Sequence, residues 1–214
     1  GLFTNRILEV TEGNKVSALL SLSYTQEKKT AQKEYVETQV IHNRNAMSWD
    51  DDRKACSFVT AKDPVVQKFA KSVSGMIKEA PYAALDVNLV SALALHEALD
   101  QYGVTYVVDP KTPFQQYSQN DTAIDYLQFP KQTLEFQAGD CDDLSILYAA
   151  LLEAVGIETA FITTPGHIYV ALALAVGPEE AERRFYRKQD LVVRDGRVWL
   201  PVEVTERSRG FLKA

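Results

Sequence analysis

The spacing of apolar residues changes at Asp63-Pro64 in this chain of 214 residues. Before that point the spacing is close to two, most clearly at Val16, Ala18, Leu20, Leu22 and Tyr24. Such alternation is typical of a half-buried β-strand. After that point the apolar residues follow helical spacing, which indicates amphipathic helices. The sequence therefore predicts two modules, residues 1–62 and residues 63–214.

The first module is predicted to be a small antiparallel β structure. Besides the strand at 16–24, strands are expected at 6–10, 35–41 and 55–60, separated by polar, turn-prone runs. Four short strands suggest a sandwich-like module. A module of about sixty residues buries only a small core alone, so we expect it to be stabilised by contacts with the rest of the chain.

The second module begins with helices that have clear start and stop signals. Asp63 as N-cap and Pro64 at the first helical position predict a helix through Ile77. A second helix is expected from about residue 87 to residue 102, with Gly103 as its stop. Residues 104–138 show no clear period, which predicts a long irregular connection of the kind that often lines a site.

The residues after 138 are predicted to form one strong helix followed by a sheet. The helix spans 140–155 and is stopped by Gly156. Strands are expected at 157–163 and 167–176, then a short helix at 178–186. The last predicted element is a hairpin around Asp195-Gly196, a dipeptide that suits a tight primed turn. The whole chain is therefore predicted to be an α+β protein.

Composition narrows the class of function. The net charge is −6, with +1 in residues 1–62 and −7 in residues 63–214, and such an acidic surface disfavours nucleic-acid binding. Two cysteines, Cys56 and Cys141, exclude a disulfide framework and a cysteine-rich zinc module, although a single bridge between them stays open. The longest unbroken apolar stretch, 168–176, is too short to span a bilayer.

Cys141 lies in the first turn of the strongest predicted helix. Free backbone N–H groups and the positive end of the helix dipole favour a thiolate there, by about 0.3–1 kcal/mol at an exposed site. The flanking Asp142 and Asp143 oppose it. A reactive thiol at neutral pH therefore needs a stronger partner, and an imidazolium is the usual one.

His167 is the histidine best placed to be that partner, because it opens a strand directly after Pro165-Gly166. If the last strand pairs antiparallel with the strand that His167 begins, Glu203 comes beside the imidazole. Nucleophile, base and orienting carboxylate then follow in the order Cys, His, Glu. His42 and His96 are interpreted as a surface and a helix-packing histidine.

Four ordered blocks resemble the transglutaminase-like superfamily, and are most similar to its bacterial transglutaminase-like cysteine peptidase branch. The blocks are Gly139-Asp140-Cys141-Asp142-Asp143-Leu144-Ser145, Leu151-Leu152-Glu153-Ala154-Val155-Gly156-Ile157, Pro165-Gly166-His167-Ile168-Tyr169-Val170-Ala171 and Trp199-Leu200-Pro201-Val202-Glu203-Val204-Thr205. The resemblance covers about residues 126–205, is looser over 63–125 and is absent over 1–62. It implies a papain-like core with a Cys at a helix start facing a His and an acidic residue on adjacent strands.

The resemblance implies cysteine-type amide hydrolysis, with Cys141 as nucleophile, His167 as base and Glu203 at a position where the family usually has Asp. The residue types alone leave two alternatives open: acyl transfer to an amine, which makes cross-links, and a binding or assembly module without turnover. Candidate donors to the oxyanion are the Cys141 backbone N–H and the side chains of three residues that precede it, Gln132, Gln137 and Tyr126.

No metal or other cofactor is expected. Asp140 and Asp143 are interpreted as helix N-terminal caps, and neither they nor 50–52 have the spacing of an EF-hand loop. The expected partner is a peptide or protein substrate, with no nucleic acid and no membrane span. Gly at position 1 and the abrupt end at Ala214 lead us to expect a piece of a longer polypeptide. An extracytoplasmic compartment is one option for it, and the compartment stays open.

Overall fold

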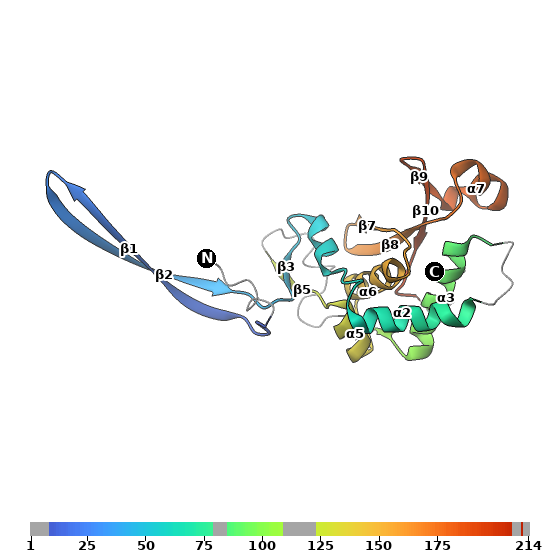
Figure 1. Ribbon diagram of the computed structural model, residues 1–214, viewed down its shortest axis with the longest axis horizontal. Helices are drawn as coiled ribbons and strands as arrows, with labels where there is room; N and C mark the ends of the chain where they lie inside the picture. Colours follow the sequence, from blue (N-terminus) through green and yellow to red (C-terminus); the bar gives the residue numbers. More distant parts are fainter. Residues whose placement is uncertain (1–8, 79–84, 109–122, 207–210, 212–214) are drawn as a thin grey trace. The chain divides into compact units, whose positions relative to one another are not determined.

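The structure is a computed structural model that describes residues 9–78, 85–108, 123–206 and 211 (Figure 1). The chain divides into two compact units, Gly1–Ala46 and Met47–Ala214. The predicted boundary lay after residue 62, so residues 47–62 belong with the second unit instead of the first.

The described part of the first unit is one long antiparallel hairpin. Its strands are β1 (Asn14–Gln26) and β2 (Lys29–Ile41). Glu27 and Lys28 both have positive φ, 50° and 61°, which is the backbone of a two-residue primed turn. Both strands were predicted, but the described residues show a two-stranded ribbon where the sequence suggested a sandwich-like module. Most of the expected strand at 6–10 lies outside the described residues.

Residues 47–62 join the second unit because their apolar side chains are buried in its core. Strand β3 (Ala46–Ser48) is followed by the 3₁₀ helix η1 (Asp52–Phe58), so the strand predicted at 55–60 is wrong. The Asp51 side chain accepts the Arg53 N–H and caps this helix. The small cluster around η1 buries Met47, Trp49, Ala55, Phe58, Leu127, Cys141, Ile146 and Ile168.

The helices of the second unit were predicted from start and stop signals, except the one at Pro130–Phe136, which lies in the segment predicted to be irregular. They are α2 (Pro64–Ile77), α3 (Val87–Tyr102), α5 (Pro130–Phe136), α6 (Cys141–Ala154) and α7 (Pro178–Arg184). Asp63 accepts the Val65 N–H over 2.8 Å and Asp86 accepts the first N–H groups of α3. Gly103 and Gly156 end α3 and α6 with φ of 90° and 86°.

Residues 104–138, predicted to be irregular, contain short ordered elements wherever the structure describes them. These are β4 (Thr105–Tyr106), β5 (Ile124–Tyr126), α5 and β6 (Ala138–Gly139). β5 pairs with β3, and β4 runs parallel to β6. Elements of two to seven residues are too short to produce a readable period, so they could not be predicted from periodicity.

The main sheet has four antiparallel strands in the order β7-β8-β10-β9. Their bounds are β7 (Thr159–Thr164), β8 (His167–Ala173), β9 (Val192–Arg194) and β10 (Arg197–Val202). The predicted hairpin is confirmed, since Asp195 and Gly196 have φ of 52° and 74° between β9 and β10. The short 3₁₀ helix η2 (Lys188–Asp190) precedes β9.

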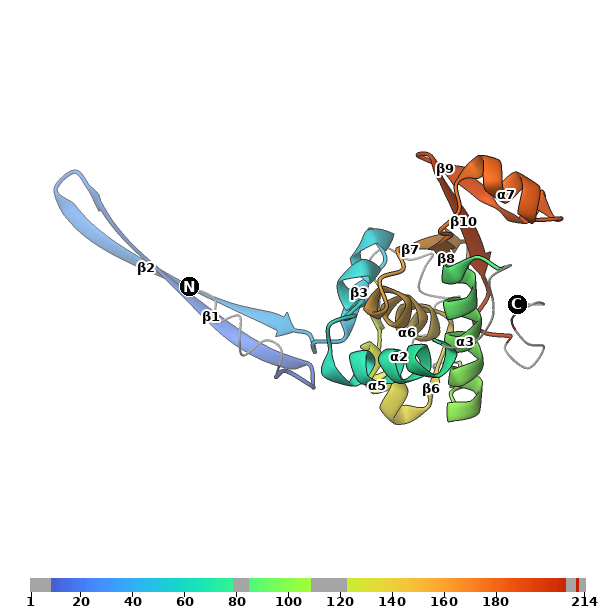
Figure 2. The same ribbon diagram turned by 45° about the vertical axis from the view of Figure 1, so that its right-hand side comes forward.

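Helix α6 lies between this sheet and the helices α2, α3 and α5 (Figure 2). Every residue from Cys141 to Leu152 is buried, so α6 is enclosed on all sides where the sequence predicted one apolar face. The Tyr148 hydroxyl, inside this core, donates to the Ala92 carbonyl over 2.9 Å. The predicted α+β class is confirmed at this level. Among the described residues no helix has the length and apolar character needed to cross a bilayer.

Candidate functional site

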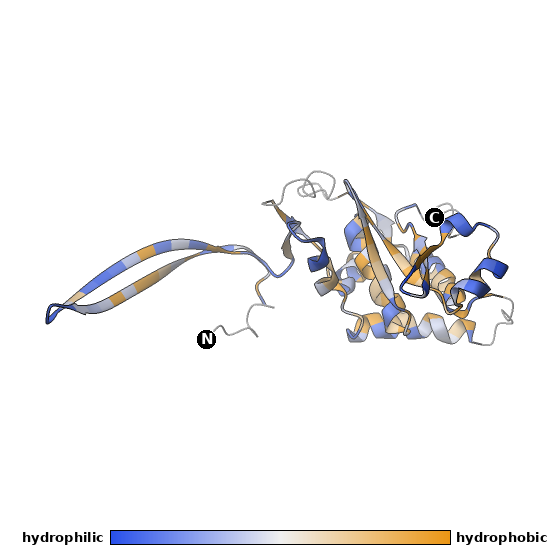
Figure 3. Ribbon diagram, turned by 90° about the horizontal axis from the view of Figure 1, so that it is seen from above, coloured by the Kyte–Doolittle hydropathy of each residue, from blue (hydrophilic) through white to orange (hydrophobic). Residues whose placement is uncertain are grey.

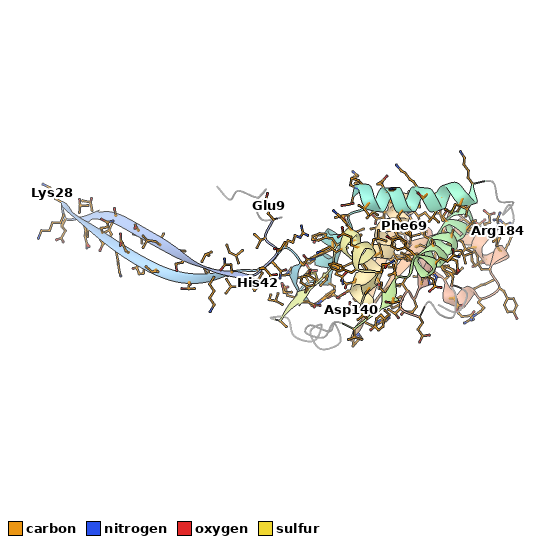
Figure 4. All side chains as sticks on the ribbon, turned by 90° about the horizontal axis from the view of Figure 1, so that it is seen from below. Glu9, Lys28, His42, Phe69, Asp140 and Arg184 are labelled. Atoms are coloured by element: carbon orange, nitrogen blue, oxygen red, sulfur yellow. The ribbon has the colours of Figure 1, made fainter. Side chains whose placement is uncertain are left out.

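Cys141 is the first residue of α6, and its side chain is almost completely enclosed, with 3% of the residue exposed. Asp140 precedes it in an extended conformation and marks the start of the helix (Figure 4). The Asp140 side chain makes no capping hydrogen bond, in contrast to the prediction for it. The Cys141 sulfur accepts a hydrogen bond from the backbone N–H of Ile168, the residue that follows His167.

His167 is brought to the start of α6 by the β7–β8 hairpin. Thr164 pairs with His167 across the turn that contains Gly166, whose φ is 75°. The buried Ser145 hydroxyl, one turn after Cys141, donates to the Ile168 carbonyl over 3.1 Å. Strand β8 therefore begins directly against the first two turns of α6.

Glu203 follows β10 and contacts the His167 ring, as the predicted strand pairing requires. β10 pairs antiparallel with β8, and Val202 lies opposite Val170. His167 Nε2 pairs with Glu203 Oε2. Glu203 Oε1 accepts from the Thr205 N–H over 2.9 Å and from the Thr205 hydroxyl over 2.7 Å. One carboxylate oxygen thus faces the imidazole and the other is fixed by Thr205.

The hydrogen bonds to Glu203 determine its charge state. Burial acts to raise its pKa, but the hydrogen bonds from His167 and Thr205 outweigh burial and lower the pKa below the usual value. Glu203 is therefore an anion at neutral pH. Tyr169 stacks on the His167 ring with centroids 5.8 Å apart and restricts the ring further.

The environment of Cys141 favours the neutral thiol. Burial, followed by the negative charge of Asp140, raises the pKa of Cys141 to about 12, against the hydrogen bond from the Ile168 N–H. From the sequence, the helix terminus was expected to favour the thiolate by a small amount, with Asp142 and Asp143 opposing it. A buried carboxyl cluster beside the thiol opposes that effect, and its burial is a property of the tertiary structure.

Three carboxyl groups gather around the start of α6. The oxygens of Asp140, Asp142 and Asp143 lie within 4.8 Å of one another, and all three residues are buried. Burial and the neighbouring Asp140 raise the pKa of Asp143 to about 8, and burial with a hydrogen bond to Asp140 raises that of Asp142 well above its usual value. The negative charge of this cluster can be neutralised in two ways. One is a bound hard cation, which prefers oxygen ligands at such spacing, and the other is protons shared between the carboxyl groups.

The three side chains considered as oxyanion donors occupy different places. Gln132 Oε1 accepts the Phe129 N–H in the first turn of α5. Gln137 Nε2 donates to the Tyr102 carbonyl at the end of α3. Tyr126 is the last residue of β5 and is half-buried. Gln132 Oε1 and Gln137 Nε2 are thus engaged in hydrogen bonds with Phe129 and Tyr102, whereas the Cys141 backbone N–H is part of the first turn of α6.

Tyr106 is a residue near the site that the sequence did not indicate. In the parallel pair β4–β6 it lies opposite Gly139, two residues before Cys141. Burial, and then the charges of Cys141, Asp140 and two further acidic groups, raise the pKa of Tyr106, which places its hydroxyl within electrostatic range of the thiol. A strand of two residues in an aperiodic segment leaves no pattern from which this could have been found.

A buried hydrogen bond joins Trp49 to Asp125, which acts electrostatically on the carboxyl cluster. The Trp49 indole N–H donates to Asp125 Oδ2 over 2.7 Å, and both residues are buried. Asp125 contributes to raising the pKa of the cluster carboxyls Asp142 and Asp143. Because Asp125 lies 76 positions from Trp49 in the chain, the sequence did not indicate this pairing.

The two other histidines occupy the kinds of position expected for them, and the second cysteine is also a free thiol. Cys56 is exposed, Cys141 is buried, and both are free thiols. His96 is buried in α3 with its ring edge-on to Tyr148 at 6.1 Å, which agrees with a packing role. His42 is exposed in the first unit.

Comparison with known proteins yields little. No protein-family model matches the chain, and no curated protein does. Among solved structures it is similar to one described as "a putative protease from Parabacteroides distasonis ATCC 8503", with 9% identity and a TM-score of 0.37. The match covers 77% of this chain and 36% of the other, so the chain spans about a third of that protein. Similarity this low carries no argument about activity, and the function proposed below depends on the chain's own residues.

Proposed function

We propose that the second unit hydrolyses amide bonds of a peptide or protein through a thioester on Cys141. The observation that carries the proposal is the placement of the thiol against the start of β8, where His167 Nε2 is paired with the anionic Glu203. The same arrangement supports membership of the transglutaminase-like superfamily, near the bacterial transglutaminase-like cysteine peptidases.

In the proposed mechanism the thiol is deprotonated only as it attacks. Because the pKa of Cys141 is raised to about 12, the resting site holds a neutral thiol. His167 Nδ1 takes the thiol proton while the sulfur bonds to the substrate carbonyl carbon, and Glu203 stabilises the imidazolium that forms. The backbone N–H of Cys141 is the proposed donor to the oxyanion.

The tetrahedral intermediate then breaks down to a thioester and an amine. The carbon–nitrogen bond breaks, the amine leaves with the proton from the imidazolium, and the acyl group remains on sulfur as a thioester. Neutral imidazole next removes a proton from water, which attacks the thioester and releases the acid and the thiol. The carboxyls of Asp142 and Asp143, held protonated by their raised pKa, add little negative charge during these steps.

One observation favours a non-catalytic binding module instead. Cys141 is nearly inaccessible and its environment favours the thiol, so a substrate carbonyl needs some opening of the site to reach the sulfur. A binding module with the same fold would need neither accessibility nor activation. Acyl transfer to an amine differs from hydrolysis only in the acceptor that resolves the thioester.

Product analysis with a glutamine-containing peptide tests these alternatives. The peptide is incubated with the chain, with and without a primary amine, and with Cys141→Ala as the inactive control. Hydrolysis predicts cleaved or deamidated product whose yield the amine does not reduce. Incorporation of the amine at the expense of hydrolysis would assign a transferase, and no product above the Cys141→Ala background would favour the binding module.

A further inference from the structure

The β1–β2 hairpin presents an apolar face that nothing covers within the described part of the first unit. All 26 residues of the two strands are exposed. The register places the alternate residues of both strands on one face, and its large exposed apolar members are Val16, Leu20, Leu22, Tyr24, Tyr35 and Ile41. The hydropathy colouring shows apolar and polar positions alternating along both strands (Figure 3).

A hairpin of this kind needs a partner to be stable. An isolated two-stranded hairpin is marginal in water, and three or more strands with an apolar face are needed for independent stability. β1 and β2 each have one edge that pairs with the other strand, and the remaining edges are unpaired among the described residues. Unpaired edges of this length are templates for another strand.

The two free edges differ in charge. β2 carries Lys29, Lys33, Glu34 and Glu37, and charged residues along an edge oppose addition of a further strand. β1 carries Lys15 alone among its 13 residues. The β1 edge is therefore the one suited to accept a strand.

The sequence of β1 is complementary to itself when two copies run antiparallel. With Leu20 at the centre, Leu20 faces Leu20 of the second copy, Ala18 faces Leu22, and Val16 faces Tyr24. Moving the register by two residues in either direction places an apolar side chain opposite a polar one at each end. The centred register is therefore the one that matches every apolar position of this face.

The remaining positions fit the same register except that Leu19 faces Ser21. Asn14 faces Gln26, Ser17 faces Ser23, and Lys15 faces Thr25, so no like charges come together. We propose that two copies of this chain associate through their β1 strands, antiparallel about Leu20, to form a four-stranded sheet β2-β1-β1-β2. The assembly places the β1 edges, which carry only Lys15, inside and the more highly charged β2 edges outside.

Sedimentation equilibrium of the 214-residue chain and of two charge variants tests the proposal. The unsubstituted chain is expected to dimerise with increasing concentration. Leu20→Lys and Leu20→Glu, each measured alone, place like charges directly opposite one another and raise the dissociation constant at least about tenfold. An equal mixture of the two variants places opposite charges together and is expected to dimerise again, which separates a broken interface from a misfolded hairpin.

Tyr35→Lys is the matched control, because Tyr35 is on the same face and pairs with Leu20 within the chain but lies on β2. It is expected to retain the dimer. A chain that is monomeric at every concentration, or a mixture of charge variants that stays monomeric, would overturn the proposal. Loss of the dimer in Tyr35→Lys as well would assign the contact to face-to-face packing and would overturn pairing through the β1 edge.

Discussion

Replacing Asp143 by Asn tests whether the carboxyl cluster at the start of α6 is protonated in the folded protein. Asp143 is 4% exposed, and its Oδ1 accepts the Gln128 N–H over 2.7 Å. Burial and the neighbouring Asp140 raise its pKa from 3.8 to about 8. Asparagine has the shape of the protonated acid and retains the acceptor for Gln128, so the substitution removes the titration and leaves the packing in place.

The sign and size of the effect follow from the two pKa values. The folded state keeps a proton that the unfolded state releases, so the contribution of Asp143 to stability is fully present below about pH 4 and is lost as the pH rises through about 8. At about 1.4 kcal/mol per pH unit, the loss reaches about 4 kcal/mol between pH 4 and pH 7. Relative to the unsubstituted chain, Asp143→Asn therefore gains up to about 4 kcal/mol over this interval, or roughly 10 °C in Tm.

Calorimetric Tm values from pH 5 to pH 8, in EDTA, give the comparison. The difference in Tm between Asp143→Asn and the unsubstituted chain is expected to grow in favour of the variant as the pH rises. Asp100→Asn, at an exposed position of α3, is the control. Its Tm is expected to differ from that of the unsubstituted chain by the same amount at every pH. Parallel curves of Tm against pH for Asp143→Asn and the unsubstituted chain would refute the reasoning.

Three further substitutions test other parts of the structure. Trp49→Phe removes the indole N–H that donates to the buried Asp125, and chemical denaturation should show a loss of about 1–3 kcal/mol; an unchanged stability would contradict the contact. Gly139→Ala places a Cβ 2.6 Å from the Cβ of Asp143, so thermal unfolding should show a cost of about 1–3 kcal/mol, and a neutral result would mean that β6 is less closely packed on α6. Glu203→Gln removes the charge that pairs with the histidine ring, and the acylation rate should fall at least about tenfold without loss of fold; an unaltered rate would exclude an orienting role.

Those parts of the fold that depend on local signals were predictable from the sequence. Asp63-Pro64 starts α2, and Gly103 and Gly156 end α3 and α6, because capping and left-handed backbone depend on the residue itself. The Asp195-Gly196 turn was predictable for the same reason. Pairing of His167 with Glu203 also followed, since an antiparallel hairpin and a period of two determine which side chains become neighbours.

The features that depend on tertiary packing were not predictable. Ala55 and Phe58 are apolar residues three apart, a spacing that suits the 3₁₀ turn of η1 as well as a strand, and only their burial in the second unit separates the two. The local effects on Cys141, from the helix terminus and the flanking aspartates, could be read from the sequence, whereas the burial that raises its pKa depends on the elements that enclose α6. The position of Tyr106 near Cys141 likewise depends on the pairing of β4 with β6, whose paired residues are 33 positions apart in the chain.

Acylation of Cys141 by p-nitrophenyl acetate is the most direct test of the proposed chemistry. The measurement uses a Cys56→Ser background, because Cys56 is an exposed free thiol that would also react. We predict a burst of p-nitrophenol, an acetyl group that peptide mapping assigns to Cys141, and a rate that His167→Ala lowers by about a hundredfold or more. A folded chain in which Cys141 remains unmodified, or is acetylated equally fast without His167, would contradict the account.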